Sequence, residues 1–488
     1  MRFGFLMKIA ATIALVLLFH WLFPDGFDGA RIGVLAAAWL GLLFAVRPDV
    51  RGDRRAWGVA AVAAAFAGVL FDDPGPLPWV LFWAALSVAA LIPRVAAFDD
   101  AWRWTMRLLV HGVGTPFALP FDIRRMGGVR GRGVSPTRVA ATLALPVIGA
   151  IVFLFLFASA NPLIEHAFSG VALPEPWQLG LWAAVAAMAW PAFRPRAAAL
   201  RWAARLPDPA PRIPGTSLPS VLLALTTFNL IFAAQNGLDI AFLWSGAGLP
   251  DGVSAADYAH RGAYPLIVTA LLAGVLALVM LRPGSASAGN RWARRLVTLW
   301  VAQNLLLVAS SALRTVDYID ESMLTAWRIA ALLWMALVAQ GLVLIGWRIL
   351  AGRSARWLVN ANALAAGIVL SLCSVVDLGA TAAAYNVQAQ RPEAVDLCYL
   401  SGVGDGALLP VIALERRAMD AATRKRVRYV RRMLYADLAS RQAYWGSWTL
   451  RGSCRLSAAR AQLGSAAAMP VDPRARNCDG SLPRQVQS

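Results

Sequence analysis

The sequence predicts an all-α protein, a polytopic transmembrane helix bundle of about 11 spans with a small helical extracytoplasmic C-terminal domain. Hydrophobic residues make up 59% of the 488 residues, and charged residues only 15%, against roughly 25% in soluble proteins. The apolar residues form long stretches, and arginines fall between them. This composition argues against an ordinary soluble enzyme, which could not bury so much apolar surface, and against a disordered chain, which would be far more polar.

The spans follow from the length of each apolar stretch, because a helix needs about 20 mostly apolar residues to cross a bilayer. Several of the first six are only 15 to 17 residues long, so one of them could be re-entrant. The first resembles a signal peptide, but no small-x-small cleavage site follows, which favours an uncleaved helix. The predicted spans are Phe5–Phe23, Ile32–Val46, Trp57–Phe71, Leu77–Ile92, Val139–Phe157, Trp177–Phe193, Leu218–Phe242, Tyr264–Leu281, Leu296–Leu313, Leu324–Ile349 and Leu358–Ala383.

The distribution of basic residues predicts the orientation, because cytoplasmic loops carry an excess of lysine and arginine. Alternate loops counted from the N-terminus hold 26 basic residues on one side and 3 on the other. The N-terminus is therefore expected in the cytoplasm, and an odd number of spans puts the tail outside. The tail itself carries 16 basic residues from Arg391 onward, but long segments translocate largely regardless of charge.

These predictions divide the chain into six parts. They are residues 1–92 with four spans, 93–138 as a cytoplasmic loop, 139–193 with spans five and six, 194–217 as a cytoplasmic linker rich in proline and arginine, 218–383 with spans seven to eleven, and 384–488 as the tail domain with a disordered end.

The loop 93–138 contains an amphipathic stretch. Trp102, Met106 and Leu109 recur at helical spacing, with Arg103 and Arg107 on another face. One interpretation is a helix at the inner surface of the lipid bilayer, with these arginines on anionic headgroups as partners. The other is a cytoplasmic helix packed on the bundle, and the sequence favours neither. The net charge of +19 is spread between spans rather than along one surface, so no nucleic-acid partner is expected.

The chain has four cysteines, three of them in the tail. A tail outside the cytoplasm permits a disulfide. The sequence cannot fix the pairing, and Cys454 with Cys478 is the pair we expect, with free thiols as an even alternative.

An ionisable group at membrane depth costs free energy, so its presence indicates a structural or functional role. Five such groups are expected at a similar depth under the outer face: Asp239, Arg261, Arg314, Arg328 and Asp377. They could form a paired network or line the mouth of a site for an anion or a lipid headgroup. Alternatively, each charge lies near a helix end and reaches separately toward water. We favour a structural role or separate charges over a substrate site.

No pattern indicates a cofactor or a metal. The four histidines do not form a zinc motif, and neither HExxH nor CxxC occurs. No Ser/His/Asp grouping or GxSxG turn is found, so no catalytic residue is predicted.

Two stretches carry a resemblance to a family. One contains Tyr258, Arg261 and Gly262 just before a span, and the other contains Tyr318, Thr325 and Arg328. They resemble the bacterial multi-pass membrane proteins known as domain of unknown function 4173, with departures at His260 (usually arginine) and Met323 (usually glycine). The resemblance covers roughly residues 218–400. It implies an integral protein of the bacterial inner membrane and assigns no activity.

Three functional hypotheses remain. The first is a membrane scaffold or sensor that links the outside domain to the inner basic loops. The second is a transporter or permease with a polar site near the outer face that uses Asp239, Arg261 and Arg328. The third is a membrane enzyme that acts on lipid-linked substrates.

Overall fold

The structure is a computed structural model, and it describes residues 2–24, 26–95, 100–127, 175–195, 217–245 and 285–464, with single positions at 149, 272, 276, 478, 479 and 481. Within these residues the regular structure is entirely helical, as predicted. The chain divides into two compact units, of which the first comprises Met1–Leu70, Trp79–Phe98 and Thr105–Ala204. The second comprises Phe71–Pro78, Asp99–Trp104 and Arg205–Ser488.

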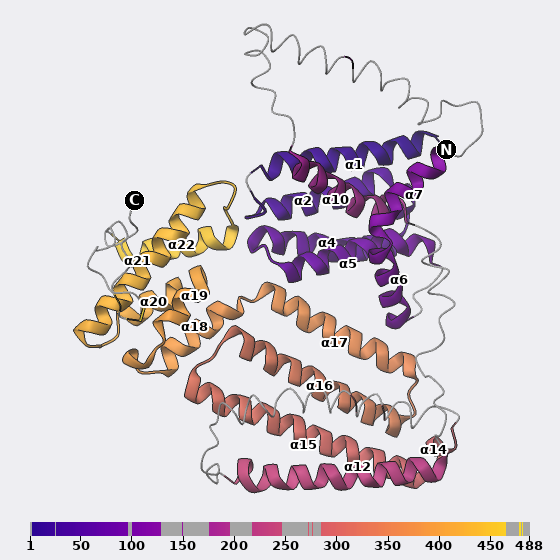
Figure 1. Cartoon of the computed structure of the whole chain (residues 1–488), viewed down its shortest axis with the longest axis vertical. Coiled ribbons are helices and arrows are strands. Elements are labelled where there is room, and N and C mark those ends of the chain that lie inside the picture. Colours follow the sequence, from indigo (N-terminus) through magenta and orange to yellow (C-terminus); the bar gives the residue numbers. More distant parts are fainter. Residues whose placement is uncertain are drawn as a thin grey trace. The chain divides into compact units, whose positions relative to one another are not determined.

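Nine helical elements make up the described N-terminal part of the chain (Figure 1). They are α1 (Arg2–Leu22), α2 (Arg31–Val46), α3 (Pro48–Arg51), α4 (Arg54–Asp72), α5 (Pro76–Leu91), η1 (Ile92–Arg94), α6 (Ala101–Val113), α7 (Thr115–Gly127) and α10 (Pro176–Phe193).

The first unit is held together by an apolar core and by one buried arginine. Its core draws side chains from α1, α2, α4, α5 and α10, including Leu15, Trp39 and Phe82. Arg47, at the end of α2, is 1% exposed and pairs with Asp49 at 2.6 Å. Its guanidinium also donates to the carbonyls that end two other helices, Ala90 at 3.0 Å and Ala192 at 2.9 Å. An arginine predicted in a loop therefore joins three helix ends.

The predicted amphipathic helix in the loop 93–138 is present as α6. Its side chains Leu109 and Val113 are exposed, as are Phe117 and Phe121 of α7. On the polar side of the helix, Arg107 is only 4% exposed. Arg103 lies 3.7 Å from the carboxylate of Asp100. Little of the Arg107 surface is open to a lipid headgroup, so headgroup binding at Arg103 and Arg107 stays a proposal.

The membrane helices of the second unit form a row (Figure 1). They are α12 (Leu218–Asp239), continued by the π-helical turn η2 (Ile240–Trp244), then α15 (Arg291–Ser322) after the short α14 (Ala286–Gly289), α16 (Ala326–Ala351) and α17 (Ala355–Val375). Side-chain caps begin α15, α16 and α17, namely Asn290, Thr325 and Ser354. Gly352 ends α16 in a left-handed conformation, at φ 64°.

Eight helical stretches among the described residues are long and apolar enough to cross a membrane. Seven coincide with predicted spans: Gly4–Leu22, Arg54–Asp72, Pro76–Arg94, Leu218–Asp239, Arg291–Ser322, Ala326–Ala351 and Ala355–Val375. Two more predicted spans form α2 and α10, of 16 and 18 residues. The spans predicted at Val139–Phe157 and Tyr264–Leu281, and the linker 194–217, lie almost entirely outside the described residues. The chain is thus an integral membrane protein, and the total of about 11 spans stays a prediction.

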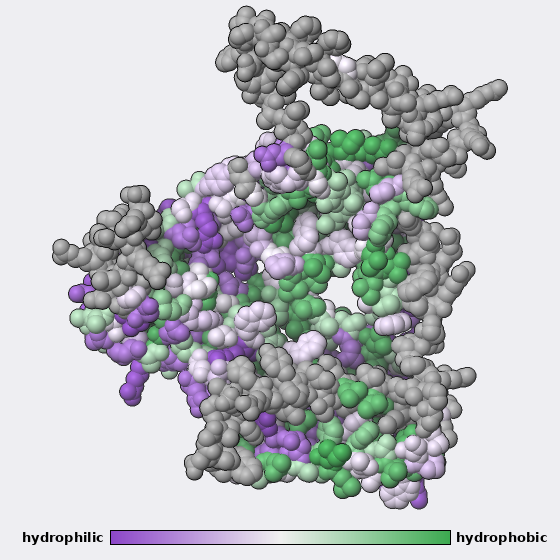
Figure 2. All heavy atoms as spheres, in the orientation of Figure 1, coloured by the Kyte–Doolittle hydropathy of each residue, from purple (hydrophilic) through white to green (hydrophobic). Residues whose placement is uncertain are grey.

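The tail forms a compact helical domain. Its elements are α18 (Leu378–Ala389), η3 (Pro392–Ala394), α19 (Leu397–Val403), η4 (Gly404–Ala407), α20 (Leu408–Glu415), α21 (Ala421–Ala443) and α22 (Leu450–Leu463). They enclose a separate apolar core that includes Leu400, Val411 and Val430. Figure 2 shows many hydrophilic side chains over these helices.

The eighth apolar stretch, Leu397–Glu415, belongs to this domain. It is interrupted at Gly404, whose φ of 79° breaks the helix, and its apolar side chains line the tail core. The last predicted span, Leu358–Ala383, is also divided. Helix α17 ends at Val375, and Asp377 caps the new helix α18 by accepting a hydrogen bond from the Ala380 backbone at 2.8 Å. Asp377 therefore lies beyond the membrane helix rather than within it.

Candidate functional site

A seam of polar side chains joins α12 to α15. The Asn229 amide donates to the Leu296 carbonyl at 3.0 Å, and the Asn236 amide to the Gln303 carbonyl at 3.2 Å. The partner numbers rise together on both helices, so α12 and α15 run parallel. This agrees with their predicted places as the seventh and ninth spans, because spans of odd number cross in the same direction.

The seam ends in a buried ion pair between Asp239 and Arg314. Asp239 is 1% exposed, and its Oδ1 accepts hydrogen bonds from the Arg314 guanidinium and from the Gln235 amide, the latter at 3.1 Å. Beyond Asp239 the α-helix changes to the π-turn η2, and Trp244 in that turn donates to Ser310 Oγ at 3.0 Å. π-turns within helices are frequent at functional sites.

Several buried acceptors in this seam have no donor among the described residues. They are Asp239 Oδ2, Asn236 Oδ1, Gln303 Oε1 and Asn304 Oδ1. Buried polar atoms without partners are uncommon and costly in native proteins. The arrangement can therefore accept hydrogen bonds from a water molecule or a ligand, or coordinate a cation.

The structure divides the predicted cluster of five charged residues. Asp239 and Arg314 meet, as the prediction of a paired network required. Arg328 and Asp377 bind elsewhere, each to its own partners (below). Arg261, with Tyr258 and Gly262, lies outside the described residues.

The second predicted motif builds the turn between α15 and α16. Thr325 caps α16 by accepting from the Arg328 backbone at 3.3 Å. The Arg328 guanidinium donates to the carbonyls of Ser322 and Met323, which end α15, and lies 4.0 Å from the centre of the Tyr318 ring. Because both helix ends are satisfied by motif side chains, the motif explains a tight turn rather than a ligand site.

Two side chains of the tail domain form hydrogen bonds with the backbone of this same turn. The Asn386 side chain on α18 accepts from the Leu324 backbone N–H and donates to the Leu324 carbonyl, both at 2.8 Å, and it is fully buried. Tyr399 Oη on α19 accepts from the Ala326 backbone at 3.3 Å. Sequence reasoning missed Asn386 and Tyr399, since a single asparagine or tyrosine in a helical stretch carries no pattern that signals a distant backbone partner.

Asp377 belongs to a charged network inside the tail. Its carboxylate binds the Arg455 guanidinium, which also donates to Asp405 at 3.2 Å. Burial raises the pKa of the Asp377 carboxyl, but hydrogen bonds from the Ala380 backbone and Arg455 outweigh it and hold the pKa below its usual value. This network ties α18 to α22 and is structural.

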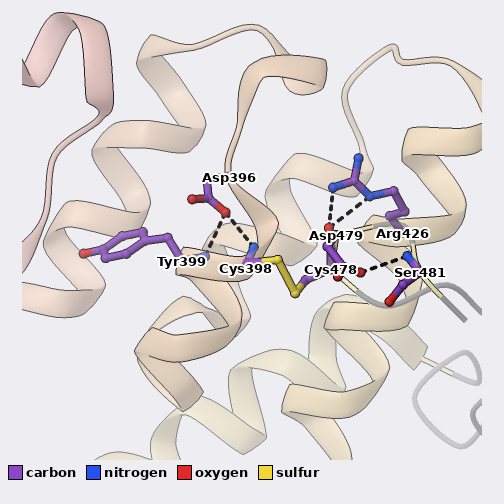
Figure 3. The surroundings of a disulfide bond; sticks show 7 residues. All are labelled: Asp396, Cys398, Tyr399, Arg426, Cys478, Asp479 and Ser481. Carbon is purple, nitrogen blue, oxygen red and sulfur yellow. Dashed lines mark hydrogen bonds between the residues drawn. A yellow bond between two sulfur atoms is a disulfide. The ribbon is translucent and has the colours of Figure 1, made fainter. Parts of the chain in front are cut away.

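A disulfide joins Cys398 to Cys478 (Figure 3). Cys454 is a free, exposed cysteine. The expected pair of Cys454 with Cys478 is therefore wrong. Asp396 caps α19 and fixes the start of that helix, where Cys398 lies, by accepting from the Cys398 and Tyr399 backbones at 2.8 and 3.0 Å. The Arg426 guanidinium binds the Cys478 carbonyl. The partner was not predictable because loop lengths alone do not decide which cysteines meet.

No group of three or more histidine, cysteine, aspartate or glutamate side chains that could hold a metal occurs within the residues the structure describes.

One family model matches the chain, over residues 56–414. It is the domain of unknown function 4153 (DUF4153). The chain belongs to this family. The expected family carried a different number, 4173, so the finer assignment is corrected while the prediction of a family without an assigned activity holds. No curated protein and no solved structure matches the chain.

The DUF4153 region extends well beyond the stretch that the sequence resemblance covered. It begins in α4, includes the polar seam and the α15–α16 turn, and ends at residue 414 in α20. Helices α21 and α22 and Cys478 lie after it.

Proposed function

We propose that this DUF4153 protein is a membrane scaffold or sensor of the bacterial inner membrane, with its N-terminus in the cytoplasm and its tail domain outside. The observation that carries the proposal is the reciprocal pair of hydrogen bonds between Asn386 and Leu324. Through these hydrogen bonds, the tail domain, which has its own core, binds the turn between α15 and α16. A change in the tail would therefore be transmitted directly to α15 and α16.

Two further observations support the orientation. The basic residues concentrate in the loops predicted to be cytoplasmic, 26 against 3. The tail contains a disulfide, and disulfides persist in the oxidising space outside the cytoplasm.

Complementation tests the proposal. A strain that lacks the gene is compared with its parent across envelope-stress conditions, and variants are then returned to it. We expect Asn386→Ala to fail to complement, because it removes both hydrogen bonds to Leu324. Ser354→Ala removes only the side-chain cap of α17, which lies at the other end of α16 from the α15–α16 turn, and this variant should complement. Immunoblots check that both variants reach normal abundance, and full complementation by Asn386→Ala would contradict the proposal.

A transporter is the second candidate, and the buried acceptors of the seam favour it. Asp239, whose Oδ2 has no donor among the described residues, could bind a cation or a proton-coupled substrate. The two candidates differ in one double variant. Asp239→Asn combined with Arg314→Gln leaves no unpaired buried charge. A scaffold or sensor should therefore tolerate the double variant, whereas a transporter that uses Asp239 should lose complementation with the protein at normal abundance on immunoblots.

A further inference from the structure

A pocket of about 580 Å³ lies in the tail domain, where α20 ends, α21 begins and α22 ends. Five arginines line it together with one carboxylate: Arg416, Arg417, Arg424, Arg428, Arg431 and Glu415. The pocket therefore carries a formal charge of +4. Its volume lies within the range of about 300–1,000 Å³ that is usual for small-molecule sites.

Internal contacts orient these arginines without neutralising most of them. Glu415 accepts from Arg428 at 2.9 Å and from the buried Arg431 at 2.6 Å, so one carboxylate is shared by two guanidinium groups. Arg416 donates to the Gln462 carbonyl at 3.2 Å, and Arg417 to the Gln390 carbonyl at 2.9 Å. Neutral carbonyls orient these two groups, and no carboxylate that the structure describes pairs with them.

Arg424 is the open group of the pocket. Its side chain makes no hydrogen bond or ion pair with any residue that the structure describes. It follows the N-terminal cap of α21, in a run with Lys425, Arg426 and Arg428. Cations near a helix N-terminus are disfavoured by the helix dipole, and here they also repel one another. A bound anion would relieve both effects.

We propose that this pocket binds a phosphate-bearing anion. Guanidinium groups match phosphate geometry with two parallel hydrogen bonds, and several arginines held at one place are typical of phosphate recognition. The same chemistry occurs in soluble polyphosphates and in phospholipid headgroups. The charged residues of the site lie beyond the DUF4153 match, and phosphate binding there does not depend on whether the tail acts as a sensor.

Calorimetric titration of the purified full chain tests the proposal. In one arm the protein sits in nanodiscs of neutral phosphatidylcholine and is titrated with sodium tripolyphosphate. In the other it is titrated with short-chain phosphatidylglycerol below its micellar concentration. Saturable binding in the first arm alone indicates a soluble phosphate, and binding in the second alone a lipid headgroup. Either result supports the pocket, provided that the variants below respond as expected.

The variants separate the pocket from the general positive charge of α21. Arg424→Gln together with Arg428→Gln should weaken binding at least tenfold, because two charge-assisted contacts are lost. Lys425→Gln removes a charge from the same helical turn but does not line the pocket, and it should change affinity less than threefold. Absence of binding in both arms, or equal losses in both variants, would overturn the proposal. Thermal unfolding confirms that the variants fold.

Discussion

At the residue scale, Met323 is the one residue other than glycine with a positive φ in the described parts of the chain, at 70°. Such a backbone conformation costs a side-chain-bearing residue about 1–3 kcal/mol. Met323 tolerates it because its side chain is buried, its Sδ accepts from the Asp396 backbone at 3.5 Å, and Asn386 holds the next residue. The family resemblance expected glycine here, and the backbone explains why glycine suits the position.

This backbone conformation predicts that glycine is more stabilising than alanine at position 323, the reverse of the order expected inside a helix. Met323→Gly should be more stable than Met323→Ala by about 1 kcal/mol, because both remove the side chain but only glycine relieves the backbone. Met335, which is buried within α16, supplies the control. There the Met335→Ala variant should be more stable than Met335→Gly by about 1 kcal/mol, because glycine is unfavourable inside a helix. Thermal unfolding in detergent measures both pairs. The same order at both positions would contradict the role assigned to the backbone at Met323.

At the element scale, the pairing of α12 with α15 depends on the ion pair at the end of their seam. Removing one partner of a buried pair leaves an uncompensated charge and typically costs about 3–5 kcal/mol, whereas removing both costs much less. Asp239→Asn and Arg314→Gln should therefore each destabilise the protein more than the double variant does. Thr227→Val on α12, which breaks only a bond within its own helix, should change stability little. A double-mutant cycle on unfolding free energies tests this, and additive single effects would refute the coupling.

At the scale of the whole molecule, the proposed orientation, with the tail outside the cytoplasm, predicts which thiols can be labelled. Cys454 is free and exposed, whereas Cys398 and Cys478 are joined. A maleimide that cannot cross membranes should label the protein on spheroplasts without permeabilisation, and Cys454→Ser should lose most of that signal. Prior reduction should add labelling at the two joined cysteines. Labelling only after permeabilisation would place the tail in the cytoplasm.

The sequence predicts the membrane helices well, because the bilayer requires long apolar stretches. It does not predict which distant side chains meet, because tertiary packing decides those contacts. Apolar length identified α12, α15, α16 and α17, and a similar expected depth grouped Asp239 with Arg314, which form an ion pair. Depth could not distinguish Asp377, because a helix that ends and restarts within a few residues keeps the same apolar composition. Asn386 forms hydrogen bonds with the backbone of a residue 62 positions away, and this contact depends on tertiary packing that no local pattern encodes. The choice of cysteine partner depends on packing in the same way.

The bond between Cys398 and Cys478 also sets an order of events during biogenesis. The second cysteine is synthesised 80 residues after the first, and Cys454 is made between them, so the bond cannot close until all three thiols have been synthesised. Until then Cys398 is an unprotected thiol that can meet Cys454 first. With the tail outside the cytoplasm, as proposed, its maturation calls for a thiol oxidase or isomerase that acts after export, and strains without one should accumulate the pair of Cys398 with Cys454.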